Sequence, residues 1–182
     1  MDYIIIVAGG KGLRMGGDIP KQFLPVGGKP VLMRTLERFR EYSAELQIIL
    51  VLPEAQQTYW HQLCKDYHFD VEYTLANGGE TRYHSVQNGL KKVPDDAQGV
   101  VGVHDGVRPF VSIEVIRACY ETARIKKVNV CVIAKRLGQI GFHCRAECIP
   151  QEFLCPNVRL FVERILLCIG TCFPRLVQTV TK

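Results

Sequence analysis

The chain has 182 residues, of which 47% are hydrophobic and 23% charged, and its formal net charge is +5. This length suits one domain with a substantial core and is too short for two ordinary domains. The composition is typical of a soluble globular protein, and no apolar run approaches the 18 residues that a membrane span needs. Asp2 stands where a signal peptide would carry basic residues, so we expect a cytoplasmic protein with no membrane partner.

The excess of positive charge is not gathered into a patch. The longest basic runs are pairs such as Lys91-Lys92 and Lys126-Lys127, whereas a nucleic-acid interface needs a dense basic surface with interleaved aromatic residues. We therefore expect no nucleic-acid partner. A small phosphorylated substrate would favour the same sign of charge.

Cysteine is unusually frequent toward the end of the chain. Six of the eight cysteines fall in the last third, and without a secretion signal we expect free thiols. His143, Cys144, Cys148 and Cys155 form no C-x-x-C pair and match no common zinc spacing, so we predict no metal site there.

The first predicted element is a buried strand that runs into a glycine-rich loop. Five apolar residues, Tyr3 to Val7, are typical of a strand in a parallel sheet. Gly9, Gly10 and Gly12 lack a Cβ atom, which lets the backbone approach a ligand closely. Open α/β sheets bind ligands at the carboxyl ends of their strands, and exposed backbone N–H groups there attract anions, so we expect a phosphate.

Two familiar phosphate loops do not fit this stretch. A dinucleotide fingerprint would need a glycine where Met15 stands, and a Walker loop would need Ser or Thr where Pro30 stands. The loop carries instead two cations, Arg14 and Lys21, which could enclose a triphosphate and neutralise charge during phosphoryl transfer. The alternative is that both are ordinary solvated surface cations.

Further strands and helices alternate along the chain. The sequence predicts strands at residues 47–52, 71–75, 100–103 and 128–133. Helical spacing predicts helices beginning near residue 30, over 54–68, after the turn at 77–79, and over 112–126, the last capped by Ser112. This alternation predicts an α/β fold with a mostly parallel sheet and helices on both faces.

Polar residues follow three of the predicted strands and should therefore lie along one edge of the sheet. Asp105 ends up beside the glycine loop in this arrangement, where a carboxylate can hold Mg²⁺ through one oxygen. Its alternative role is that of a turn aspartate before Gly106. Judged from its position alone, Ser85 suits the N-cap or the first turn of a helix.

Three blocks in this order resemble the signatures of the 2-C-methyl-D-erythritol 4-phosphate cytidylyltransferases. The blocks are Ala8-Gly9-Gly10-Lys11-Gly12-Leu13-Arg14-Met15-Gly16 with Pro20-Lys21-Gln22-Phe23-Leu24, then Gly78-Gly79-Glu80-Thr81-Arg82-Tyr83-His84-Ser85, and Val103-His104-Asp105-Gly106-Val107-Arg108-Pro109. The resemblance covers about residues 1–127. It implies a single Rossmann-like nucleotidyltransferase domain and a homodimer.

The resemblance also implies roles for individual residues. It implies catalytic roles for Arg14 and Lys21, a Mg²⁺ cofactor at Asp105, and a nucleotide site formed by Ala8, Gly9, Gly10, Lys11, Gly12, Gly79, Glu80 and Ser85. We expect Arg82 to be structural, Arg108 to brace its loop, and His84 to be a surface residue without a partner. Gly106 and Val107 stand where the family usually has two alanines.

The implied reaction transfers a cytidylyl group from CTP to 2-C-methyl-D-erythritol 4-phosphate, a sugar-alcohol phosphate, and releases pyrophosphate. Two alternatives stay open: an inactive CTP-binding remnant, and a cytidylyltransferase for another alditol phosphate such as ribitol 5-phosphate. They stay open because the family's acceptor-binding motifs are not found in residues 128–182.

We treat residues 1–182 as one nucleotidyltransferase domain whose part 128–182 departs from the family. That segment has no aspartate and only three glutamates. Three accounts remain open for it: a shifted reading frame, a divergent relative without its acceptor pocket, or a different end to the domain in which residues 158–169 form a closing helix.

Overall fold

A computed structural model gives the fold, and it describes residues 1–9, 19–126, 130–134, 140–144 and 158–162. The elements in chain order are β1 (Tyr3–Val7), the 3₁₀-helix η2 (Lys21–Phe23), β2 (Pro25–Val26), β3 (Lys29–Pro30), α1 (Val31–Tyr42), β4 (Gln47–Leu52), α2 (Glu54–Asp66), β5 (Thr74–Asn77), α3 (Arg82–Leu90), β6 (Gly99–Asp105), α4 (Ile113–Lys126), β7 (Val130–Ala134), β8 (Ile140–Cys144) and β9 (Val158–Val162).

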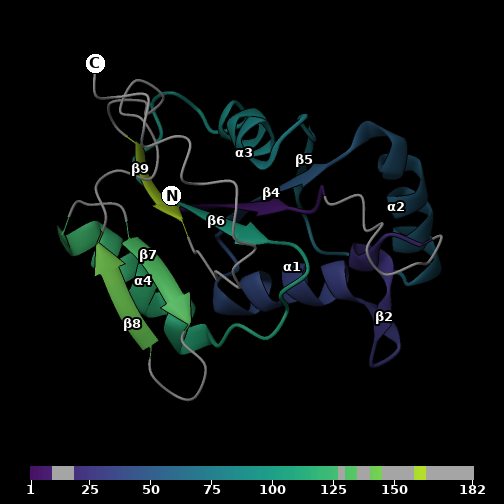
Figure 1. Ribbon diagram of the computed structural model, residues 1–182, viewed down its shortest axis with the longest axis horizontal. Coiled ribbons are helices and arrows are strands. Elements are labelled where there is room, and N and C mark those ends of the chain that lie inside the picture. The colour runs from purple at the N-terminus through teal and green to yellow at the C-terminus, as the bar shows by residue number, and fades with distance from the viewer. Residues whose placement is uncertain (10–18, 127–129, 135–139, 145–157, 163–182) are drawn as a thin grey trace.

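A seven-stranded sheet in the order β5-β4-β1-β6-β9-β7-β8 forms the centre of the molecule (Figure 1). Neighbouring strands are parallel except β7 and β8, which form an antiparallel pair. β2 and β3 form a separate short hairpin. The mostly parallel sheet confirms the predicted fold class and places the carboxyl ends of β1, β4, β5 and β6 along one edge.

The core lies on both faces of the sheet because residues alternate between faces along a strand. Ile4 and Ile6 belong to the larger cluster, in which α1, α2 and α4 supply buried side chains. Ile5 belongs to the smaller cluster, against which Val86 and Leu90 of α3 pack. Helices therefore cover both faces, as the alternation of elements predicted, and α1 and α3 lie on opposite sides of the sheet in Figure 1.

Several element boundaries differ from the sequence prediction. β5 begins at Thr74 rather than at residue 71, and β6 extends past residue 103 to Asp105. The extension follows from pairing, since Asp105 lies in register with Val7 of β1. β4 has the predicted bounds, and Pro30 is the N-cap of α1 rather than its first residue.

The alternative of a closing helix over residues 158–169 is wrong for residues 158–162, and residues 163–169 lie outside the described residues. Residues Val158–Val162 form strand β9, which pairs in parallel with β6 and with β7. Two valines and a phenylalanine in this pentapeptide are residue types enriched in strands, which suits a position between two other strands. The predicted strand at 128–133 is found as β7 (Val130–Ala134).

Candidate functional site

Parts of the three sequence blocks meet at the carboxyl edge of the sheet. Ala8 and Gly9 directly follow β1, Gly78 and Gly79 directly follow β5, and Asp105 is the last residue of β6. The registers place Val7 opposite both Val51 and Asp105, so these strand ends are level. The gathering of the three blocks at one edge is confirmed.

Ser85 joins two of these segments. Its Oγ accepts a hydrogen bond from the Gly79 N–H at 2.9 Å and donates one to the Thr81 carbonyl at 3.0 Å, and the residue is buried. A Cβ atom on Gly9 would lie 3.8 Å from the same oxygen. The start of α3 therefore lies directly against the loop that follows β1, and Glu80 is exposed at this junction.

Thr81, not Ser85, is the N-cap of α3. Its Oγ1 accepts from the His84 backbone N–H, and it also contacts His84 Nδ1 at 3.1 Å. His84 is exposed, as expected for a surface residue, but it has a partner in Thr81, because an N-cap hydroxyl lies within reach of the residue three positions later. Ser85 lies one position further into the helix, as a first-turn serine.

Gly79 is tightly enclosed by the same helix turn. A Cβ atom at this position would come within 2.4 Å of His84 Cβ and 2.9 Å of Ser85 N. Only glycine fits there without a shift of the backbone at the start of α3. The segment that precedes α3 is thereby held close to the buried Ser85 hydroxyl.

Lys21 lies on η2 with its side chain exposed. Two backbone bonds close this turn, from Phe23 N to the Pro20 carbonyl and from Leu24 N to the Lys21 carbonyl. No ion pair of the Lys21 ammonium is found within the part of the chain that the structure describes. The predicted site residues Gly10, Lys11, Gly12 and Arg14 lie outside the described residues.

Asp105 is held by two arginines. Arg82 Nη1, from α3, pairs with Oδ1, and Arg108 Nε approaches Oδ2 at 3.1 Å. Arg108 therefore braces its loop, as expected. Arg82 has the structural role that we expected, because its ion pair connects α3 to the end of β6 at the candidate site.

Two buried polar side chains hold the loop that follows Asp105. The ring of His104 contacts the Arg108 carbonyl at 2.9 Å, and Thr35 Oγ1 donates to the Gly106 carbonyl at 2.9 Å. Both His104 and Thr35 are buried. Neither bond was predicted from the sequence, because residue spacing does not indicate that the side chain of His104 or Thr35 will contact a backbone carbonyl of this loop.

The glycine at position 106 has a local explanation. A Cβ atom there would lie 2.8 Å from Ala8 Cβ and 2.9 Å from Leu32 Cδ1. The departure from the family's usual alanine therefore suits the close packing of this loop against β1 and α1.

The donor set at Asp105 fits a magnesium ion that is shared with a substrate. No group of three or more potential metal-binding side chains occurs among the described residues. Mg²⁺ needs only one or two protein carboxylates when substrate phosphates and water supply its other ligands. Each Asp105 oxygen contacts one arginine nitrogen, so each keeps a further lone pair that a cation can use.

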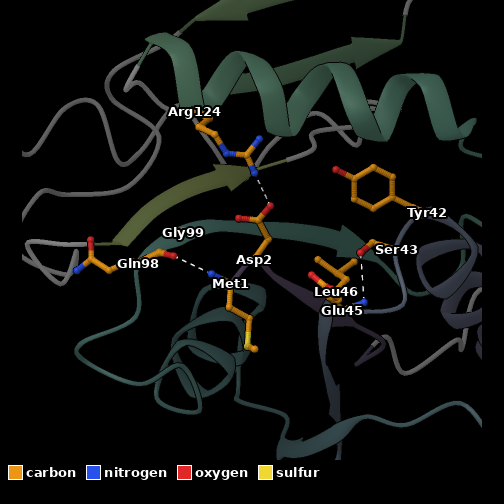
Figure 2. A pocket seen from close by; sticks show the side chains of 9 residues that line it. All are labelled: Met1, Asp2, Tyr42, Ser43, Glu45, Leu46, Gln98, Gly99 and Arg124. Carbon is orange, nitrogen blue, oxygen red and sulfur yellow. Dashed lines mark hydrogen bonds and ion pairs between the residues drawn. The ribbon is translucent and has the colours of Figure 1, made fainter.

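A pocket of about 330 Å³ lies at the opposite edge of the sheet (Figure 2). It is bounded by strand beginnings and helix ends, with Asp2, Gly99 and Arg124 among its lining residues. Asp2 Oδ2 pairs with Arg124 at 2.6 Å, and the Met1 amino group donates to the Gln98 carbonyl at 2.9 Å. This pocket contains none of the predicted site residues.

Comparison with known proteins identifies the family. A model of the family IspD, 2-C-methyl-D-erythritol 4-phosphate cytidylyltransferase, matches residues 3–136. The 2-C-methyl-D-erythritol 4-phosphate cytidylyltransferase of Bacteroides thetaiotaomicron is 68% identical over 130 residues, which are 71% of this chain and 58% of the relative. That of Phocaeicola vulgatus is 64% identical over 131 residues, 72% of this chain and 59% of the relative.

Solved structures share the fold. The 4-diphosphocytidyl-2C-methyl-D-erythritol synthase of Anaerococcus prevotii superimposes with a TM-score of 0.57 at 25% identity, covering 79% of this chain and 66% of its own. Rv0371c of Mycobacterium tuberculosis superimposes with a TM-score of 0.59 at 22% identity over 98% of both chains, which shows a common fold alone.

The chain spans somewhat under three fifths of the length of the curated relatives it matches, 58% and 59% for the two above. No helix in the described part of the chain is both long and apolar enough to cross a membrane. The family model nevertheless covers well over half of the chain. The chain belongs to the 2-C-methyl-D-erythritol 4-phosphate cytidylyltransferase family.

Proposed function

We propose that this chain transfers a cytidylyl group from CTP to 2-C-methyl-D-erythritol 4-phosphate and releases pyrophosphate. The observation that carries the proposal is the meeting of three segments, after β1, after β5 and at the end of β6, at one edge of a parallel sheet. Open α/β sheets bind their ligands at this edge. Family membership supplies the reaction type.

The reaction needs no nucleophile from the protein. A phosphate oxygen of the acceptor forms a bond to the α-phosphorus of CTP. The bond from that phosphorus to the oxygen that bridges to the β-phosphorus then breaks, and pyrophosphate leaves with the bonding electrons. Catalysis rests on positioning and on neutralisation of the growing charge, the role we assign to Lys21 and Arg14.

The junction of Gly79 and Ser85 is our candidate for the cytosine-reading site. Backbone groups beside Gly79 and Glu80, with the buried Ser85 hydroxyl, can distinguish a ring that carries an amine donor from one that carries a carbonyl. Gly9, which follows Ala8 at the end of β1, lies beside the same serine hydroxyl.

Asp105 is our candidate Mg²⁺ ligand, with Arg82 and Arg108 orienting its carboxylate. Asp105 would hold the ion, and the ion would supply positive charge that neutralises part of the charge on the phosphates. We extend the proposal to a homodimer and a cytoplasmic location, as the family resemblance and the N-terminal sequence led us to expect. Light scattering of the purified chain tests the first, and cell fractionation tests the second.

The test of the reaction is pyrophosphate release by the purified chain with CTP, Mg²⁺ and 2-C-methyl-D-erythritol 4-phosphate, each omitted in turn. We expect release only when all three are present. CTP binding by calorimetry without any release would contradict the proposal and indicate a nucleotide-binding remnant. Release with ribitol 5-phosphate but not with the first acceptor would assign a different alditol phosphate.

A further inference from the structure

The first turn of α2 carries two adjacent glutamines whose amides reach two different segments. Gln56 Oε1 accepts a hydrogen bond from Gln22 Nε2 at 2.6 Å. Gln57 Nε2 donates to Asn77 Oδ1 at 2.8 Å and to the Leu52 carbonyl at 3.2 Å. One segment contains Lys21 and the other precedes Gly79, so a single helical turn contacts both parts of the candidate site.

Gln22 is the buried anchor of the Lys21 segment. It lies directly after Lys21, is only 1% exposed, and its Oε1 has no hydrogen-bond partner among the residues that the structure describes. A buried amide is costly unless it is hydrogen-bonded, so the bond to Gln56 is what stabilises it in this position.

Aromatic packing holds the same segment on the same helix. The ring of Phe23 meets Tyr59 edge to face at a centroid distance of 5.2 Å and stacks on Trp60 at 6.1 Å. Tyr59 and Trp60 both belong to α2. The Lys21 turn therefore rests on α2 through one amide pair and two ring contacts.

The contacts of Gln57 lie at the end of β5. Asn77 is the last residue of that strand, and it also accepts a bond at its carbonyl from Asn88 Nδ2. The following Gly78 N–H donates to the Leu52 carbonyl at 2.7 Å, the same carbonyl that Gln57 contacts. Gln57 thus determines where the chain leaves β5 toward Gly79.

We infer that Gln56 and Gln57 are positioning residues that set Lys21 relative to the Gly79 segment. The inference rests on the proposed function, because it gives Lys21 and Gly79 their roles. Neither glutamine contacts the reacting atoms in this scheme. Gln56 acts through Gln22 on the cation, and Gln57 acts through Asn77 on the base-reading backbone.

The variants Gln56→Ala, Gln56→Glu and Gln57→Ala test the inference in steady-state kinetics. Gln62→Ala is the matched control, because Gln62 lies on the same helix, is exposed, and bonds only to Asp66 among the described residues. A misplacement of about 1 Å can cost up to about 100-fold in rate, so we expect Gln56→Ala to lower kcat about tenfold with a CTP KM within about threefold.

The other variants have distinct expected patterns. Gln56→Glu retains an acceptor for Gln22 Nε2 and should therefore keep most of the activity that Gln56→Ala loses. Gln57→Ala should raise the KM for CTP about tenfold with a smaller change in kcat, since it disturbs binding more than charge neutralisation. Gln62→Ala should change neither constant. Equal losses in all four variants would overturn the inference.

A double-mutant cycle separates positioning from general destabilisation. Because Gln56 acts through Lys21, Gln56→Ala should cause no further loss in a Lys21→Ala background. An additive loss in the double variant would show that Gln56 acts independently of Lys21 and would overturn the assignment.

Hydrogen exchange gives a readout that does not depend on turnover. The amides of Phe23 and Leu24 bond within the Lys21 turn. We expect both to exchange about tenfold faster in Gln56→Ala and at the original rate in Gln62→Ala. Unchanged exchange in Gln56→Ala would overturn the inference, whereas a wild-type chain without pyrophosphate release would overturn only the proposed function.

Discussion

The two edges of the central sheet use polar residues in opposite ways. At the amino edge, Asp2 Oδ1 accepts from the Val100 N–H at 3.0 Å while Oδ2 pairs with Arg124, and the Met1 amino group donates to a carbonyl. At the carboxyl edge, Lys21 and Glu80 are exposed, and neither has an ion-pair partner among the described residues. Polar groups at the amino edge are paired with one another, whereas Lys21 and Glu80 are left exposed at the edge where we propose that the substrate binds.

Asp105 shows that the two edges do not differ simply in whether their charged residues are paired. Its carboxylate is bound by two arginines, as Asp2 is bound by one, but here the arginines come from the loop and helix that form the candidate site. The same type of ion pair therefore holds a chain end at one edge and orients a candidate ligand group at the other.

The largest expected effect is that of Lys21→Ala at the carboxyl edge. Removal of one charge stabiliser typically costs about 10²-fold or more in turnover, and the exposed side chain contributes little to folding. Pyrophosphate release and thermal unfolding measure the two quantities. Lys92→Ala, at another exposed lysine, is the control and should leave both unchanged, and turnover near the wild-type rate in Lys21→Ala would remove the role from Lys21.

The next effect is on stability, at the two glycines beside Ser85. Gly79→Ala forces a Cβ atom into the start of α3 and should lower the free energy of unfolding by about 2 kcal/mol, the scale of overpacking. Gly9→Ala places its Cβ at an ordinary contact distance and should cost less than about 1 kcal/mol. Urea unfolding compares them, and equal losses would mean that the enclosure of Gly79 is not the cause.

A smaller effect is expected at the amino edge. Asp2→Ala leaves the Val100 N–H without its acceptor and should lower the free energy of unfolding by about 1 kcal/mol, since the exposed Arg124 pair adds little. Turnover should not change. The exposed Asp96 provides the control variant, Asp96→Ala, and a loss of activity in Asp2→Ala would contradict the separation of the two edges.

The smallest effect is the pH dependence of stability near the pocket in Figure 2. Burial, with the nearby Asp2 carboxylate, raises the pKa of Tyr42 above its ordinary value near 10. The folded state therefore holds this proton more tightly than the unfolded state, so its contribution is complete below about pH 10 and is lost as the pH rises through the folded pKa.

Tyr42→Phe should make urea unfolding less dependent on pH above about pH 10 than in the wild type. Burial raises the pKa of Tyr73 to about 12, which leaves a residual slope in both proteins. Identical pH profiles for the two chains would show that Tyr42 does not contribute. Turnover at neutral pH should be the same in both.

Much of this protein follows from local sequence alone. The apolar run at residues 3–7 and the segment 47–52, which is apolar after Gln47, predicted β1 and β4 with their observed bounds, because a strand buried on both faces needs mainly apolar residues. The alternation of strands and helices predicted the parallel sheet, and a parallel sheet brings the three blocks to one edge whatever their separation along the chain.

Only the tertiary structure decided which side chains meet there. Arg82 reaches Asp105 because α3 docks beside the end of β6, and Gln56 reaches Gln22 because η2 rests on α2. Likewise, β9 is a strand because it lies between β6 and β7. Periodicity in a sequence reports which face of an element is buried, but it carries no record of the partner that covers it, so pairings between distant elements depend on how the whole chain packs.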